Sequence, residues 1–108
     1  MNSIMLVGRL AHNIEEINEK DYFGKKASKM TLAINRSYKD VDDIYQTDFV
    51  DIILWDGVAS SVKDYCHKGD IIGVRGRIET RYFEDKKNIV IIGDKVTFLS
   101  SKPIEEEK

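Results

Sequence analysis

The stretch TDFVDIILWDGVASSVKDYCHKG, residues 47–69, contains the change of pattern that decides the fold. Its first part, residues 47–56, alternates between two faces with a period of two, which indicates a β-strand. The spacing then becomes that of one face of a short helix, which Asp56 can cap and Gly69 can end. The residues on this helical face are Val58, Val62, Tyr65 and Cys66.

Four further segments show the period of strands. They are residues 2–10, 28–35, 70–83 and 88–99. Gly8 permits a bulge or bend in the first, Gly73 and Gly76 mark bends in the third, and Gly93 breaks the last. A hairpin turn fits near residues 22–26. The order strand, strand, strand, helix, strand, strand predicts an all-β protein with the OB-fold, a five-stranded Greek-key barrel with one short helix between strands 3 and 4.

The length and composition describe one soluble, folded domain. A chain of 108 residues suffices for a single core, and we expect the barrel over residues 1–100 and a loose acidic tail over 101–108. No apolar run approaches the ~20 residues of a membrane helix, and the N-terminus lacks a secretion signal. The single cysteine, Cys66, is expected to be a small buried side chain; it fits a reducing compartment, so we expect a cytoplasmic protein.

Alternation gives each strand a core face and an outer face. The predicted core residues are Met30, Leu32, Ile34, Val50, Ile52, Leu54, Val74 and Ile78. The outer face of residues 47–56 carries Thr47, Phe49, Asp51, Ile53 and Trp55. The outer face of residues 70–83 carries Arg75, Arg77, Glu79, Arg81 and Phe83. Residues 2–10 are apolar on both faces, which suggests that one face of this strand meets another subunit.

The two outer faces form one surface of rings and guanidinium groups if their strands are neighbours. Such a surface suits an unpaired nucleic-acid strand, because exposed bases stack on aromatic rings for ~1–3 kcal/mol each and arginines bind phosphates. The total charge of −2 argues against nucleic acid, but residues 75–87 hold five cations against three anions. Burial of Phe49 and Trp55 under a loop or in a subunit interface is the alternative that the pattern leaves open.

Tyr38 adds a further ring beyond the expected end of its strand. It has the parity of Met30 and Leu32, so it is either a tyrosine at the edge of the core or a stacking ring. Arg36 and Lys39 flank Tyr38, and we count both as candidate DNA contacts.

Five motifs together closely resemble the bacterial single-stranded DNA-binding protein family. They are IMLVGRL, LAINRSYKD, TDFVDIILW, YCHKGDIIGVRGRIETRYFED and VTFL, in unbroken order over residues 2–100. The resemblance implies an OB-fold, a homotetramer, with a dimer left open, and sequence-independent wrapping of single-stranded DNA. It also implies protection of DNA during replication, recombination or repair, in association with the nucleoid.

The resemblance assigns roles to particular positions. It implies stacking by Tyr38, Phe49, Trp55 and Phe83, and contacts between the DNA backbone and Lys68 and Arg81. The complete set of candidate DNA-binding residues is Tyr38, Phe49, Trp55, Phe83, Arg36, Lys39, Lys68, Arg75, Arg77 and Arg81.

The sequence departs from the family pattern in four places. Residues 11–16, AHNIEE, replace the usual Asp-Pro pair, and residues 84–90, EDKKNIV, form a shorter connection than the usual hairpin loop. Asp51 and Glu79 lie on the proposed binding face, where they either pair with arginines or weaken DNA binding. The sequence has no acidic tip that recruits repair enzymes, so it resembles the short, tail-less members, a truncated protein, or a copy from a mobile element or phage.

Two other classes of function are alternatives to DNA binding. An enzyme is not expected, because the sequence shows no Ser-His-Asp arrangement, phosphate-cradling loop or cluster of metal ligands, and we expect no cofactor. The alternative is an OB-fold module for protein–protein assembly with weak or vestigial DNA binding, which the acidic residues Asp51 and Glu79 favour.

Overall fold

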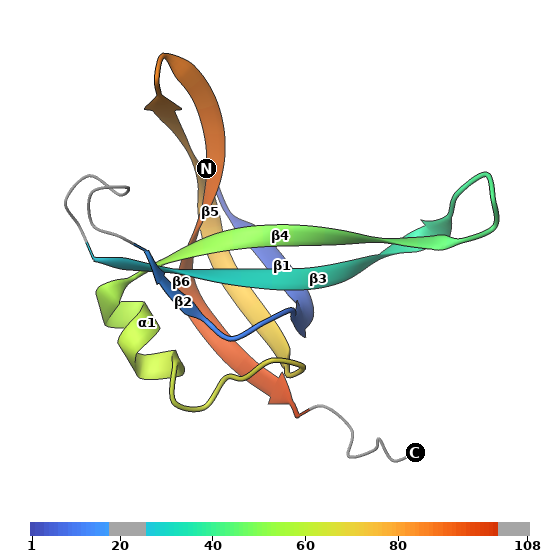
Figure 1. The fold of residues 1–108 in the computed structure, drawn as a ribbon, viewed down its shortest axis with the longest axis horizontal. Coiled ribbons are helices and arrows are strands. Elements are labelled where there is room, and N and C mark those ends of the chain that lie inside the picture. Colours follow the sequence, from blue (N-terminus) through green and yellow to red (C-terminus); the bar gives the residue numbers. More distant parts are fainter. Residues whose placement is uncertain (18–25, 102–108) are drawn as a thin grey trace.

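The computed structural model describes residues 1–17 and 26–101, and the side chain of Phe83 lies outside the described part. The elements in chain order are β1 (Ile4–Leu10), β2 (Glu15–Ile17), β3 (Ala27–Lys39), β4 (Tyr45–Trp55), α1 (Asp56–Val62), β5 (Ile71–Phe83) and β6 (Lys86–Ser100). Figure 1 shows a barrel from which β3–β4 and β5–β6 extend as two arms. The hairpin expected near residues 22–26 and most of the expected tail lie outside the described residues.

The strands form one sheet in the order β1-β5-β6-β4-β3-β2, and an additional pairing of β1 with β3 closes it into a barrel. The β4–β6 pairing is parallel, and the other pairings are antiparallel. Five long strands with one helix between β4 and β5 confirm the predicted OB-fold. The three-residue strand β2, which lies beside β3, was not predicted.

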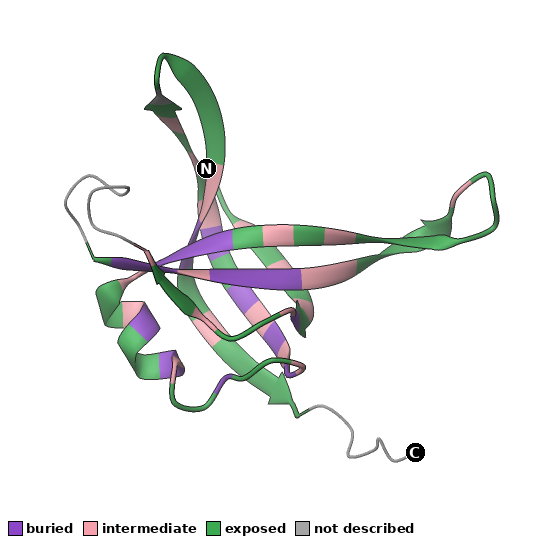
Figure 2. Ribbon diagram, viewed as in Figure 1, coloured by how far each residue is buried: buried purple, intermediate pink, exposed green. Residues whose placement is uncertain are grey.

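The main core lies inside the barrel, where the inward sides of the strands meet α1 (Figure 2). Alternation correctly predicts its buried members Met30, Leu32, Ile52, Leu54 and Val74. Ile34 and Val50 are partly buried against this cluster. Cys66 is also buried, as predicted, and burial followed by the nearby charge of Asp70 raises the pKa of its thiol.

Ile78 was predicted to lie in the core, and this prediction is wrong because its side chain is 40% exposed. The pairing of β5 with β1 ends at Gly76, and beyond that point β5 continues into the β5–β6 arm that extends from the barrel (Figure 1). Tyr65, expected on the buried face of the helix, is 45% exposed because the helix ends before it.

The ends of α1 also differ from the prediction. Trp55 occupies the N-cap position without a side-chain cap, and Asp56 is the first helical residue. The helix ends at Val62 with Lys63 as its C-cap, well before Gly69. Gly69 instead closes the following loop with a positive φ of 96°, and its N–H donates to the carbonyl oxygen of Leu10. No helix in the described residues is long and apolar enough to cross a membrane.

The glycines of the strands do not act as predicted at two places. Gly8 lies in a regular stretch of the β1–β5 pairing and makes no bulge there. Gly93 does not break its strand, because β6 continues through it to Ser100. The register instead shifts between the pairs Arg75–Lys95 and Gly76–Gly93, which leaves Asp94 as an extra residue in β6.

The connection between β5 and β6 is a two-residue turn, as short as its sequence indicates. Glu84 and Asp85 have positive φ angles of 50° and 65°, which is the backbone of a type I′ hairpin turn. The strands pair to the very end of this arm, where Phe83 is opposite Lys86.

Candidate nucleic-acid interface

The outer face of β3 and β4 is a ladder of side chains that lie directly opposite one another. Its cross-strand pairs are Ala27–Trp55, Lys29–Ile53, Thr31–Asp51, Ala33–Phe49 and Asn35–Thr47. Polar pairs on this ladder are satisfied across the strands, because the Thr31 hydroxyl donates to Asp51 at 2.7 Å and the Thr47 hydroxyl donates to Asn35 at 2.7 Å. The ladder therefore presents its rings on an ordered polar surface.

Ile53, predicted on the outer face, is only 6% exposed. It belongs to a second, smaller core with Ala27 and Ile92, on which Trp55 and Val90 pack. The parallel pairing of β4 with β6 places Ile53 opposite Ile92 and so builds this cluster outside the barrel. Alternation places Ile53 on the correct face of β4, but it does not show that residues of β6 bury this side chain.

The two rings of β4 therefore lie in different surroundings. Phe49 is 68% exposed, so nothing in the described structure buries it under a loop. Trp55 is half-buried on the second core, and the guanidinium carbon of Arg81 lies 5.7 Å from the centre of its ring. This distance is within the range of a cation–π contact.

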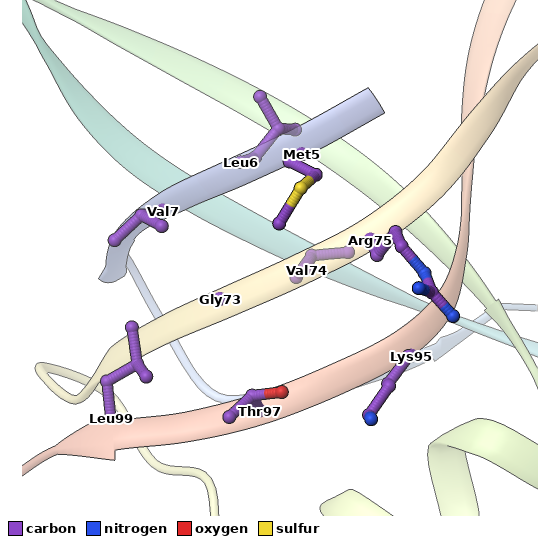
Figure 3. A pocket seen from close by; sticks show the side chains of 9 residues that line it. All are labelled: Met5, Leu6, Val7, Gly73, Val74, Arg75, Lys95, Thr97 and Leu99. Atoms are coloured by element: carbon purple, nitrogen blue, oxygen red, sulfur yellow. The ribbon is translucent and has the colours of Figure 1, made fainter. Parts of the chain in front are cut away.

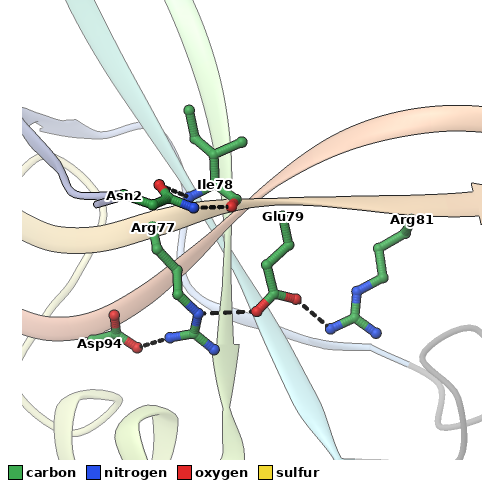
Figure 4. A network of polar contacts seen from close by, with 6 residues as sticks. All are labelled: Asn2, Arg77, Ile78, Glu79, Arg81 and Asp94. Atoms are coloured by element: carbon green, nitrogen blue, oxygen red, sulfur yellow. Dashed lines mark hydrogen bonds and ion pairs between the residues drawn. The ribbon is translucent and has the colours of Figure 1, made fainter.

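Arg77, Glu79 and Arg81 lie along one face of β5 and form an ion-pair network with Asp94 of β6 (Figure 4). Arg77 Nε donates to Glu79 at 2.9 Å, and Arg81 Nη2 donates to the other oxygen of the same carboxylate at 2.6 Å. Arg77 Nη1 also donates to Asp94. The hydrogen bond from Arg81, more than that from Arg77, lowers the pKa of Glu79.

The remaining predicted cations are dispersed over the surface. Arg36 is held by Asp48 through two hydrogen bonds of 3.0 and 2.9 Å, and the bond from Arg36 lowers the pKa of Asp48. Lys39 pairs with Asp43 at 3.4 Å. Lys68 is exposed on the loop between α1 and β5, away from the β3–β4 arm.

Tyr38 and Tyr45 lie on the β3–β4 arm. β3 continues to Lys39 through an irregularity after Asn35, so the expectation that Tyr38 follows the strand is wrong. Its side chain is 61% exposed, which excludes the edge of the core. Tyr45 is 57% exposed beneath the Lys39 ammonium and was missed, although it shares the parity of Phe49. The predicted strand simply began two residues too late.

A groove of about 290 Å³ lies over β1, β5 and β6, and its lining includes none of these rings (Figure 3). Its apolar lining includes Met5, Val7 and Leu99, which are 75%, 57% and 51% exposed. Arg75 and Lys95 border it, and among the described residues no ion pair joins Arg75 to the network of Arg77 and Arg81. The described residues contain no group of three or more His, Cys, Asp or Glu side chains arranged to hold a metal ion.

Residues 1–99 match the model of the Single-strand binding protein family. The chain is 34% identical over 110 residues to Single-stranded DNA-binding protein B of Bacillus subtilis, across 97% of this chain and 96% of that protein. It is 32% identical to Single-stranded DNA-binding protein 1 of Clostridium acetobutylicum, across 94% of this chain and 96% of that protein. A Plasmodium falciparum SSB in complex with ssDNA superposes with a TM-score of 0.71 and 27% identity, over 93% of this chain and 96% of that chain.

Proposed function

Because this chain belongs to the single-strand binding protein family, whose members are non-enzymatic DNA-binding proteins, we propose that it binds single-stranded DNA independently of sequence. The observation that carries this proposal is the exposed ring of Phe49 on the same barrel face as Trp55 and its partner Arg81. Rings stack on bases of any identity, and guanidinium groups bind phosphates, so neither reads the edges of bases.

The proposed path of the strand follows the β4 ladder. It extends from Tyr38 and Tyr45 on the arm, past Phe49, to Trp55 beside the arginines of β5. The other proposed contacts are Phe83, Arg36, Lys39, Lys68 and Arg75. We propose that the protein protects exposed strands in the cytoplasm during replication, recombination or repair, and that it removes hairpins because it binds only the unpaired form.

The single tryptophan provides the test of this function. Titration with a thymidine homopolymer is expected to quench Trp55 fluorescence strongly at low salt and less as the salt concentration rises. A duplex of equal length is the control and is expected to quench little. Absence of both quenching and a gel shift with the homopolymer at low salt would contradict the proposal and favour the protein-assembly alternative. That alternative is supported by the ion pairs that already satisfy Arg36, Arg77 and Arg81.

The variant Phe49→Ala tests whether the Phe49 ring stacks on DNA bases without changing the stability of the fold. We expect this variant to lose ~1–3 kcal/mol of binding free energy for any single strand, because the ring stacks on a base. Its melting temperature should remain close to that of the wild type, since the ring is 68% exposed. Phe98→Ala is the matched control, because Phe98 lies near the far end of β6, opposite Ile72. Equal affinities of the two variants would remove Phe49 from the site.

We propose that the groove over β1 is a subunit interface and that the assembled protein is a homotetramer, with a dimer as the alternative. Ile4 and Leu6 are partly buried on the barrel side of β1, whereas Met5 and Val7 expose their side chains on the other side. An apolar strand face of this kind on a small barrel is typical of an interface. Met5→Lys, which places a charge on this face, tests whether the groove is a subunit interface.

A further inference from the structure

We propose that the carboxylate of Glu79 occupies, in the free protein, the place that a DNA phosphate takes in the complex. A single strand would then bind by replacing Glu79 as the partner of Arg77 and Arg81. This inference rests on the DNA binding proposed above, and it adds that an internal anion competes with the DNA. Glu79 would thereby limit the affinity of the protein for single strands.

The geometry of Glu79 supports this exchange. Alternation along β5 places Glu79 between Arg77 and Arg81 on one face, and each oxygen of its carboxylate accepts a hydrogen bond from a different guanidinium. The two arginines therefore converge on one anion that has two oxygens (Figure 4). A phosphodiester group also carries one negative charge spread over two free oxygens, so it can make the same two contacts.

The charges of the network also support the exchange. Arg77 and Arg81 contribute two positive charges, and Glu79 and Asp94 contribute two negative charges, so the four side chains are neutral together. Glu79 and Arg81 are only 29% and 24% exposed, which limits how far solvent can weaken their pairing. A neutral network attracts a phosphate weakly until the carboxylate is displaced.

Arg81 links this exchange to the stacking ring. While Glu79 holds one of its nitrogens, its guanidinium carbon lies 5.7 Å from the centre of the Trp55 ring. A base can stack on that face of Trp55 only when Arg81 moves away from it. Release of Glu79 would free the Arg81 side chain to shift off the ring while its guanidinium still meets the phosphate, so the ring and the phosphate site would open together.

Glu79→Gln tests the proposal, because glutamine keeps the size and one oxygen but loses the charge. We expect the affinity for a thymidine homopolymer to rise about three- to tenfold at about 0.15 M salt. The salt dependence should also steepen, by less than the change of about 0.7 in the slope of log K against log salt concentration that one neutralised phosphate contributes. In the wild type, DNA binding releases the Glu79 carboxylate, which then attracts cations from the solution. This uptake partly offsets the release of counterions from the DNA.

Asp51→Asn is the matched control, since it removes one negative charge from the same barrel face. Asp51 accepts a hydrogen bond from Thr31, and in the described part of the chain it forms no ion pair with an arginine. We expect its affinity to rise at most about twofold, as for one exposed carboxylate beside the proposed path of the DNA that holds no arginine. Trp55 emission in the absence of DNA should change in Glu79→Gln, where Arg81 is released, and not in Asp51→Asn.

Three results would overturn the proposal. Equal gains in affinity for the two variants would mean that Glu79 acts only through its general charge. A lower affinity of Glu79→Gln would mean that Glu79 positions the arginines for DNA instead of competing with it. A wild-type protein that binds no single strand would overturn the proposed function as well, and this failure is recognised without any variant.

Discussion

Gly76→Ala is expected to destabilise the protein by about 3 kcal/mol, the upper end of the usual cost of overpacking. A Cβ on Gly76 would lie 1.9 Å from the carbonyl oxygen of Ile92 and 3.1 Å from the Cα of Gly93. Both obstacles are backbone atoms of the paired strand β6, so no change of side-chain rotamer removes the clash. The measurement is urea unfolding at fixed protein concentration, where the midpoint should fall with little change in slope.

Gly57→Ala is the control for this experiment. Gly57 lies in α1, and a Cβ there would meet no atom within 4 Å. Alanine is preferred to glycine in helices, so this variant should equal the wild type or gain about 0.5–1 kcal/mol. A Gly76→Ala protein as stable as Gly57→Ala would contradict the close approach of β5 and β6 at the register shift.

Met5→Lys is expected to dissociate the assembled protein. Met5 is 75% exposed on the groove face, directly opposite Arg75, which in turn is opposite Lys95. Lysine is chosen because glutamate could pair with these two cations and stabilise an interface. An unpaired charge buried between subunits costs about 3–5 kcal/mol, which raises the dissociation constant by two to more than three orders of magnitude.

Light scattering or sedimentation measures the mass of this variant at micromolar concentration. Val41→Lys is the matched control, because Val41 is fully exposed at the tip of the β3–β4 arm. An unchanged mass of Met5→Lys, with circular dichroism that shows an intact fold, would refute the proposed interface. A loss of mass in both variants would place the subunit contact on the arm as well.

The barrel could be predicted from short stretches because each strand repeats a local rule. Residues 47–56 need only a period of two to separate Ile52 and Leu54 from Phe49, and this separation holds in the structure. The helix after Asp56 was found from its change of spacing, but its ends were not. The helix ends at Val62, and Gly69 instead bonds to Leu10 of β1, which is a contact between distant parts of the chain.

The wrong predictions of burial, for Ile53 and Ile78, lie where the outcome depends on a strand that is distant in the sequence. Ile53 is buried because β6 runs parallel to β4 beside it, and Ile78 is exposed because β1 stops pairing at Gly76. Both side chains lie on the strand face that alternation assigns. Whether a face is covered depends on the length and register of other strands, which a local pattern does not contain.

Some features of the candidate site could likewise be predicted from the sequence, and others depend on the tertiary structure. The arginines of the site, its rings other than Tyr45, their order along the strands and the resemblance to the family could be proposed from the sequence, because residue type and spacing are local properties. The sequence alone does not decide whether the acids Asp51 and Glu79 pair with arginines or weaken DNA binding. The sequence by itself determined the barrel and most of the residues that we propose stack on bases. Only the tertiary structure decided that Glu79 joins Arg77 to Arg81 and that Arg81 lies over Trp55, because these contacts depend on how β4, β5 and β6 are placed in space.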